Sequence, residues 1–407
     1  MLTHLQKNQF NEILEELGRN LDISETQYNA AVKSYEAVGL YLAKHDSPLG
    51  MYNPEILPQG SFMLGTMIQP IHEKDDLDID LVCQLSNKPA SWTQYSLKQV
   101  IGDHLKDHGT YKKMLKSPEG RRCWTLVYSD EANYHLDILP SIVDSGYRIL
   151  LEKAFENFQQ ADTNTLALRI TDRESDNYYT EQHHLNWLKS NPFGYARWFF
   201  QQATLDLVKA QFMLEAIQPV PAYKKEKLPL QRVVQILKRH RDMMFDGNKE
   251  KPISIIITTL AGRAYQKETS IIDALLNVIE QIPRLVTEKY STAHGKYIKW
   301  IENPVNPDEN FADRWADNPN LQANFEKWIR QVRIDITEAL NQTGLHRIQE
   351  SFEKSIGSNV VRKTFSDIGD RARLLTQQGK NQLDVTTGIS SLGTATIKRH
   401  DFFGEQD

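Results

Sequence analysis

The chain has 407 residues, of which 40% are hydrophobic and 25% charged, and a formal net charge of -5 at pH 7. These values describe an ordinary folded chain that is long enough for two cores rather than one. The negative balance gives no global positive field, so a long nucleic acid is not expected as the main partner. No apolar run approaches the roughly 20 residues that cross a bilayer. Because the first residues also lack a basic-then-apolar leader, we expect a soluble cytoplasmic protein without a membrane partner.

Two helices are expected before the first strand. Leu5, Leu14 and Leu17 fit the spacing of one helical face, and Ser24–Gln27 has the form of a capping box that starts a second, long helix running to about Lys44. Between Pro54 and about Leu150 the sequence pattern changes to short apolar runs separated by turn residues. This stretch predicts the lobe that carries a sheet, and its strand-like runs read LDIDLVCQL, CWTLVYS and YHLDILPSIV.

The rest of the chain is predicted to be mainly helical up to about Leu375. The segments that begin at Leu230 and Asn324 are amphipathic. From Gly379 onward large apolar side chains are few and no period is sustained, so we expect a flexible tail.

Alternation along the run that contains Asp78 and Asp80 gives one apolar and one acidic face, because side chains of a strand alternate. Two carboxylates at i and i+2 lie roughly 6.5 to 7 Å apart at their Cα atoms. That separation suits a pair of divalent ions about 3.5 to 4 Å apart. Oxygen ligands of this kind favour Mg²⁺. An isolated Asp-x-Asp is more often a solvated strand face, so its surroundings decide the interpretation.

Two further features surround this acidic face. Upstream, Gly60 lets the backbone approach a ligand, and Ser61 can offer a hydroxyl and an N–H to phosphate oxygens. Alone, this pair would indicate a hairpin turn. Downstream, Asp137 shares a strand face with His135, which we interpret as a structural histidine, and brings a third carboxylate. The ordered set of Gly-Ser, Asp-x-Asp and a later Asp is specific and indicates one shared site rather than unrelated surface acids.

The run QGSFMLGTMIQP followed by DLDIDLVCQL resembles the core of the bacterial CD-NTases, the cGAS/DncV-like synthases of cyclic oligonucleotides. Their pattern is hydrophobic-Gly-Ser, then Asp-hydrophobic-Asp, then a later Asp. Gly60, Ser61, Asp78, Asp80 and Asp137 match it one by one. The pair formed by residues 76 and 78 also fits the Asp-hydrophobic-Asp pattern. We assign residues 78 and 80 because the following LVCQL aligns better with relatives.

This resemblance implies an α+β fold of the polymerase-β-like superfamily. It implies a nucleotidyltransferase lobe with a mixed or antiparallel sheet, an OAS-like all-helical lobe and a bilobed chain with a long N-terminal helix. The corresponding domains are residues 1–215 with the N-terminal helices and the core, residues 216–378 with the helical domain, and residues 379–407 as the tail. Similar stretches include SNPFGYARWF, LQRVVQILKRHRD and PISIIITTLAGRAY.

In the family, a lysine of the helical lobe and a serine at the start of the next helix clamp the donor triphosphate. Lys238 and Ser254 occupy these places, although a solvated helix face would equally explain the basic run KRHR. The stretch around Ser254 is β-branched and strand-like by propensity, a preference that tertiary context can override. The resemblance also implies two Mg²⁺ or Mn²⁺ ions held by Asp78, Asp80 and Asp137.

The resemblance implies an enzyme that joins nucleoside triphosphates, ATP among them, and releases pyrophosphate. Its product would be a cyclic di- or trinucleotide second messenger of anti-phage (CBASS) defence. Implied partners are an effector activated by the cyclic nucleotide and an enzyme that acts on the C-terminal tail. Two alternatives stay open: another template-independent nucleotidyltransferase, which makes a linear oligonucleotide or transfers AMP to a protein or small molecule, and a non-catalytic nucleotide-binding sensor.

Overall fold

The computed structural model describes residues 2–72, 75–128, 134–156, 163–204 and 223–378, with the backbone of 382–384, 388–390 and 395–396. The chain folds into two compact units, each described by itself below. The sheet unit comprises Ile23–Gln231 and Glu302–Asn310. The helical unit comprises Met1–Asp22, Arg232–Ile301 and Phe311–Asp407.

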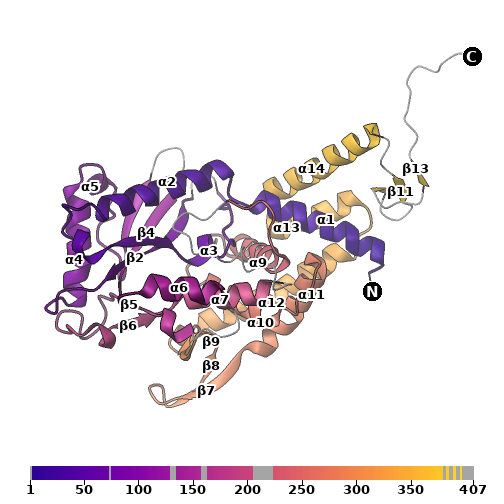
Figure 1. Ribbon diagram of the computed structural model, residues 1–407. Helices are drawn as coiled ribbons and strands as arrows, with labels where there is room; N and C mark the ends of the chain where they lie inside the picture. The colour runs from indigo at the N-terminus through magenta and orange to yellow at the C-terminus, as the bar shows by residue number, and fades with distance from the viewer. Residues whose placement is uncertain are drawn as a thin grey trace, which may run out of the picture. The chain divides into compact units, whose positions relative to one another are not determined.

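The sheet unit is built on a mixed sheet of six strands in the order β1-β2-β4-β5-β6, with β3 paired to β4 (Figure 1). The β2 and β4 strands run parallel to each other, and every other pairing in this sheet is antiparallel. The predicted mixed sheet is therefore confirmed. Its strands are β1 (Glu55–Pro58), β2 (Leu77–Ser86), β3 (Trp124–Tyr128), β4 (Tyr134–Val143), β5 (Leu168–Ile170) and β6 (Leu188–Ser190).

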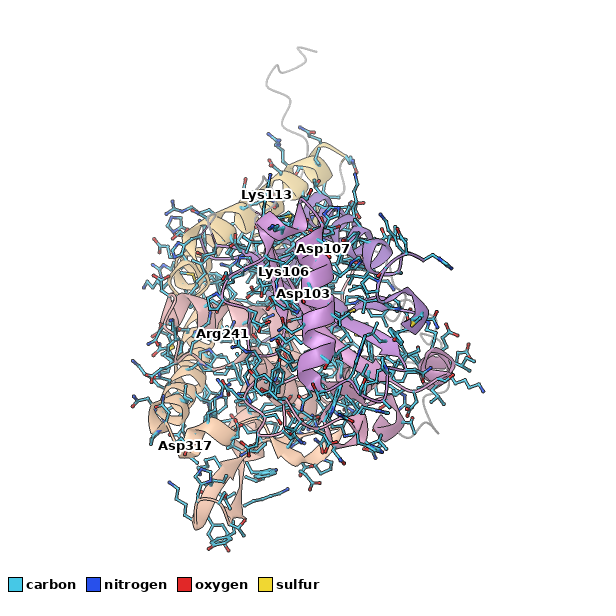
Figure 2. The ribbon with its side chains drawn as sticks, turned by 90° about the vertical axis from the view of Figure 1, so that its left-hand side faces the viewer. Asp103, Lys106, Asp107, Lys113, Arg241 and Asp317 are labelled. Carbon is cyan, nitrogen blue, oxygen red and sulfur yellow. The ribbon has the colours of Figure 1, made fainter. Side chains whose placement is uncertain are left out.

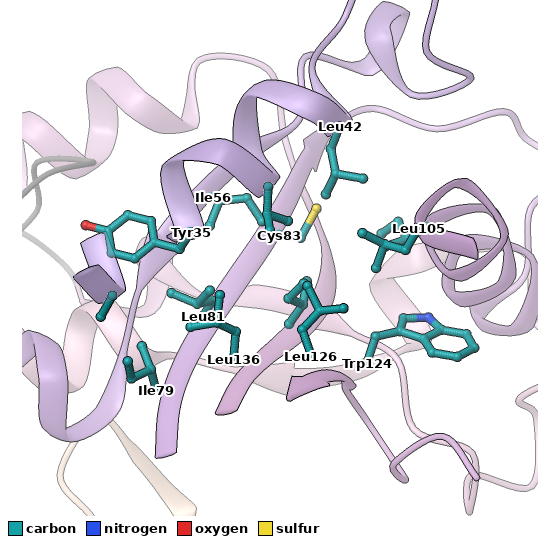
Figure 3. Packing of buried hydrophobic residues seen from close by; sticks show 14 of the residues in the cluster. Tyr35, Leu42, Ile56, Ile79, Leu81, Cys83, Leu105, Trp124, Leu126 and Leu136 are labelled. Atoms are coloured by element: carbon teal, nitrogen blue, oxygen red, sulfur yellow. The ribbon is translucent and has the colours of Figure 1, made fainter. Parts of the chain in front are cut away.

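One face of this sheet forms the main hydrophobic core of the unit. Ile79, Leu81 and Cys83 of β2 are at most 1% exposed and lie in one cluster with Leu136 of β4 and Leu126 of β3 (Figure 3). The alternate residues of β2 and β4, which include the predicted acidic positions, are not members of this cluster. Burial of these apolar side chains stabilises the unit by about 25 cal/mol per Å². A shift of one residue in the strand pairing would turn them to the opposite face, so their burial fixes the register.

Helices α2 and α4 contribute to the same core. Ser24 caps α2 and exchanges hydrogen bonds with Gln27, as the capping box predicted. The outer side of α4 carries the exposed ion pair of Asp103 with Lys106 (Figure 2). The described helices of this unit are α2 (Glu25–Leu42), α3 (Gly60–Met63), α4 (Gln94–Asp107), α5 (Tyr111–Met114), α6 (Tyr147–Glu156) and α7 (Pro192–Ala203), and β9 (Glu302–Asn303) pairs with β10 (Asn306–Asn310).

The helical unit is built mainly of helices, as predicted, and it also carries one hairpin that the sequence analysis did not expect. Strands β7 (Thr287–Ser291) and β8 (Lys296–Trp300) form an antiparallel hairpin, which alternating Tyr, Lys and Ile residues favour over a helix. The residues around Ser254 do form a helix despite their strand propensity, because nearly all of its apolar side chains are buried. The helices are α1 (His4–Leu21), α9 (Pro229–Phe245), α10 (Ser254–Ala264), α11 (Ile271–Gln281), α12 (Pro319–Leu340), α13 (Leu345–Ile356) and α14 (Ser358–Gln377).

The compact units differ from the predicted ranges 1–215 and 216–378, because the sheet unit extends to Gln231 and includes Glu302–Asn310, and because residues 1–22 lie in the helical unit. Helix α1 belongs to the helical unit, where Arg232 of α9 donates to Asp22 at 2.8 Å. Gly18 of α1 permits this contact, since an added Cβ would lie 2.5 Å from Arg232 Cδ. A buried ion pair and a close backbone approach thus tie the first helix to a segment more than two hundred residues away.

The predicted tail, residues 379–407, lies largely outside the described residues. Within it the structure gives the backbone of three short antiparallel strands, β11 (Gln382–Asp384), β12 (Gly388–Ser390) and β13 (Ala395–Thr396). The sequence pattern predicts no strand there. Across the described part of the chain, no helix combines the length and apolar character that crossing a bilayer requires.

The packing of Gly102 against Trp124 gives a stability prediction. A Cβ on Gly102 of α4 would lie 2.0 Å from Trp124 Cζ2, and the indole is held by its N–H bond to Lys98 O at 2.8 Å. We expect Gly102→Ala to lower the free energy of unfolding by about 1 to 2 kcal/mol, since overpacking outweighs the gain in helix propensity. Gly369→Ala is the matched control, because a Cβ there meets open space. It should raise stability by roughly 0.5 to 1 kcal/mol. Chemical denaturation of both variants measures the difference, and a stabilised Gly102→Ala would contradict the packing.

Candidate active site

Two predicted carboxylates lie opposite each other on the central strands of the sheet. In the parallel pairing of β2 with β4, Asp80 is the register partner of Asp137. Neighbouring strands are about 4.8 Å apart, so the two Cα atoms are close neighbours. Both residues alternate with buried core residues and therefore share the face away from the core. The structure thus brings together two of the three predicted acids.

The Gly-Ser turn lies beside this pair. Strand β1 ends at Pro58, and the Gln59 N–H donates to Asp80 O at 2.9 Å before the chain turns into α3. Gly60 has φ +58°, and a Cβ there would lie 2.6 Å from Asp80 Oδ2. Glycine is required for both reasons, because an L side chain is strained at this φ and would strike the carboxylate. Ser61 follows as the second residue of α3.

Thr125 is a site residue that the sequence motifs did not identify. It is the register partner of Asp137 on β3, and its hydroxyl donates to Asp137 Oδ1 at 2.5 Å. A hydrogen bond from a neighbouring strand restricts the rotation of the carboxylate. The alternation of the run CWTLVYS places residue 125 opposite the apolar face, which is the signal that could have identified it.

Cys123 precedes β3 and lies within reach of the charges of the acid pair. Burial first, and then the charges of Asp137 and Asp80, raise the pKa of the Cys123 thiol to about 12. The thiol is therefore protonated at neutral pH and is a poor nucleophile. The anionic field of the acid pair extends to the residue that precedes β3.

Asp78 and Asp76 both approach His135. His135 is the register partner of Asp78, whose Oδ1 is 3.5 Å from Nδ1 and whose side chain is 79% exposed. Asp76 precedes β2, and its Oδ2 is 2.8 Å from Nε2 of the same ring. Residues 76 and 78 therefore share a histidine neighbour, whereas Asp80 lies beside Gly60 and Asp137. The assignment of Asp78 and Asp80 as the pair stays a prediction from the motif.

Lys238 and Ser254 both lie in the helical unit. The solvated-face explanation of the basic run is wrong, because Lys238, Arg239, His240 and Arg241 are all at most 6% exposed. Ser254 is the first residue of α10, the helix start that the resemblance implied. Its hydroxyl accepts a hydrogen bond from Arg241 Nη1 at 2.9 Å.

The oxygen donors of Asp78, Asp80 and Asp137 suit a hard divalent cation. Among the residues that the structure describes, however, no three His, Cys, Asp or Glu side chains are gathered closely enough to hold a metal. Asp78, Asp80 and Asp137 all lie on the face of the sheet that is turned away from the core. Metal binding at this face remains a prediction from the donor chemistry.

Comparison with known proteins agrees with this geometry. Residues 54–140, which span the Gly-Ser turn and all three acids, match the family model described as Cyclic GMP-AMP synthase DncV-like, nucleotidyltransferase domain. A protein of Roseivirga ehrenbergii named c-di-GMP synthase is 27% identical over 394 residues, 96% of this chain and 94% of the relative. The cyclic dinucleotide synthase CdnG of Bradyrhizobium diazoefficiens is 22% identical over 88% of this chain and 83% of its own length.

The fold is shared with a solved structure as well. The Bradyrhizobium diazoefficiens CD-NTase CdnG, solved in complex with GTP, superposes with a TM-score of 0.65 at 19% identity, covering 88% of this chain and 97% of that one. The chain therefore shares the fold of a CD-NTase, and residues 54–140 match a nucleotidyltransferase domain. The chain thus carries a segment similar to a DncV-like nucleotidyltransferase domain and resembles cyclic dinucleotide synthases over most of its length, which is the resemblance that the sequence motifs indicated.

The contact between Gly60 and Asp80 can be tested with a matched pair of glycine variants. Gly60 and Gly146 both have positive φ, but a Cβ on Gly146 meets nothing within 4 Å. Each alanine variant should cost about 1 to 2 kcal/mol of stability from backbone strain. Only Gly60→Ala should reduce turnover, by roughly 100-fold, because it displaces the carboxylate. Thermal melting and a pyrophosphate-release assay measure the two effects, and equal activities in both variants would contradict the arrangement.

Proposed function

We propose that this chain joins nucleoside triphosphates into a cyclic di- or trinucleotide and releases pyrophosphate. The observation that carries the proposal is the pairing of Asp80 with Asp137 beside Gly60, inside the segment that matches a DncV-like nucleotidyltransferase domain. The reaction is attack of a ribose hydroxyl on the α-phosphate of a bound triphosphate. The α-phosphate forms a phosphodiester bond, and pyrophosphate leaves.

The carboxylates would hold two Mg²⁺ or Mn²⁺ ions. When bound, such ions lower the pKa of the attacking hydroxyl and neutralise charge on the triphosphate. Asp78 and Asp80 would bind from alternate positions of β2, on the same face of the strand. Asp137, oriented by the Thr125 hydroxyl, would lie nearest the attacking oxygen. The role of the protein is to fix these oxygens before the substrates arrive.

The donor triphosphate would be held by four predicted residues. At the sheet, Gly60 allows close approach of the backbone, and Ser61 offers a hydroxyl and an N–H. In the helical unit, Lys238 supplies a point charge and Ser254 a hydroxyl for phosphate oxygens. Both kinds of contact are those that bind phosphate groups in proteins generally.

The first substrate to test is GTP, and the first product is cyclic di-GMP. Support comes from the names of the relatives, a c-di-GMP synthase at 27% identity over nearly the full length of both chains and a CD-NTase solved with GTP. ATP, which the family resemblance implies, is the second substrate to test. We further propose an anti-phage (CBASS) role in the cytoplasm, with an effector that binds the product and a partner enzyme that acts on the tail.

The decisive assay incubates the purified chain with Mg²⁺ or Mn²⁺ and each combination of the four labelled nucleotides. A phosphatase-resistant product with the mass of a cyclic dinucleotide is expected from GTP alone. A linear product, or AMP attached to a protein or small molecule, would favour another template-independent nucleotidyltransferase. Nucleotide binding without pyrophosphate release would favour a sensor.

Asparagine substitutions test the roles of the individual acids. Asp80→Asn and Asp137→Asn keep the side-chain shape but remove a charge, so turnover should fall by orders of magnitude while the core face stays folded. Stability should be unchanged or slightly higher, because adjacent like charges repel. Asp78→Asn should also lose turnover. Pyrophosphate release and thermal melting measure both properties.

Asp76→Asn is the control for the register, and we expect a much milder loss. The opposite pattern, in which Asp76→Asn abolishes activity and Asp80→Asn is tolerated, would mean that the pair is residues 76 and 78. Full turnover in all four variants would refute the carboxylate mechanism itself.

A further inference from the structure

Arg241 is a buried cation at the C-terminal part of α9 for which the reaction above has no role. Its side chain is 5% exposed, and it lies in the helical unit with all the partners named here. Arg241 is labelled in Figure 2. Burial lowers the pKa of its guanidinium, but an arginine remains protonated at neutral pH. A buried charge needs partners, so its contacts identify what it does.

One side of the guanidinium is fixed by a carboxylate. Arg241 Nε donates to Asp242 Oδ1 at 2.9 Å, and Nη2 is 2.8 Å from the same oxygen. Lys251 Nζ donates to Asp242 Oδ1 at 2.7 Å. The three groups carry two positive charges and one negative charge. The cluster therefore keeps a positive charge that an anion can neutralise.

The other side of the guanidinium points at the start of α10. Arg241 Nη1 donates to Pro252 O at 3.1 Å and to Ser254 Oγ at 2.9 Å. These two bonds fix the loop that leads into the helix and the rotation of the serine side chain. The planar fork can make these contacts and the Asp242 contact together, which a lysine cannot.

This contact sets the direction in which the serine donates. A hydroxyl has one proton and two lone pairs, and Arg241 already occupies one lone pair of Ser254 Oγ. The hydroxyl proton is then free to point away from the guanidinium. Ser254 is only partly buried, so this proton can reach a ligand oxygen. A donating hydroxyl next to a net positive cluster suits a phosphate oxygen.

We infer that Arg241 is a positioning residue that presents the Ser254 hydroxyl to the phosphates of the donor nucleotide. The inference rests on the proposed function, because Ser254 is assigned to the triphosphate there. Lys238 lies three residues earlier on α9 and thus on a neighbouring part of the same helix face. The arginine acts through the serine and does not itself touch the substrate.

The test compares binding of GTP, GMP and inorganic tripolyphosphate in magnesium buffer by calorimetry. Arg241→Gln should weaken GTP and tripolyphosphate binding roughly 10- to 100-fold, with a much smaller effect on GMP. Ser254→Ala should show the same selectivity. The double variant should lose little more than either single variant, because both changes remove one contact. Arg241→Lys, which keeps the charge but lacks the fork, should lie between wild type and Arg241→Gln.

Two control variants separate positioning from stability. Arg232→Gln removes another buried arginine of α9, the partner of Asp22, and should lower the melting temperature without changing the preference for triphosphate. Arg284→Gln removes an exposed ion pair with Glu280 and should change neither the melting temperature nor the preference for triphosphate. If Arg241→Gln behaves as Arg232→Gln does, the positioning role is refuted. Failure of the wild-type chain to bind any nucleoside triphosphate would instead refute the proposed function.

Discussion

The parallel pairing of β2 with β4 is the constraint on which the candidate site depends. It sets Asp80 opposite Asp137 and, through the antiparallel neighbours β1 and β3, brings Gly60 and Thr125 to the same pair. The register is fixed from the opposite face, where alternate residues of both strands are fully buried. Hydrophobic burial on one face therefore determines the separation of charges on the other.

Placing two carboxylates in register has an energetic cost. Like charges on directly opposed residues destabilise a sheet, and removing water from around them increases that effect. The core below the pair offsets the cost, since Leu81 and Ile138 beneath it are fully buried. Carboxylates that repel each other until a cation or polar substrate binds are common in sites where binding and catalysis need preorganised charge.

The sequence predicted the carboxylate face because strand alternation is a local property. Residues 77–83 and 134–140 each divide into an apolar and a polar face by the order of their residues alone, and the order of motifs indicated the resemblance to CD-NTases. The Ser24 capping box was also predictable, since its partners are three residues apart. Thr125 was missed because its role depends on which strand lies beside β4.

Long-range packing limited the rest of the prediction. The basic run at residues 238–241 looks like a solvated face, yet each side chain is buried, because other segments of the unit, near and distant in sequence, contact α9. Asp335, for example, meets His240 at 2.8 Å from ninety-five residues away. Charge patterns on a helix thus say little about exposure when the helix is central to its unit.

The central claim is that Asp80 and Asp137 bind the catalytic cation together. A crystal structure with Mn²⁺ and a non-hydrolysable GTP analogue tests it directly, because anomalous scattering locates the metal. We predict Mn²⁺ at about 2.0 to 2.2 Å from carboxylate oxygens of both residues, with the triphosphate beside Gly60. Mn²⁺ bound by Asp76 and His135, or a nucleotide bound with no metal at the Asp80–Asp137 pair, would contradict the account.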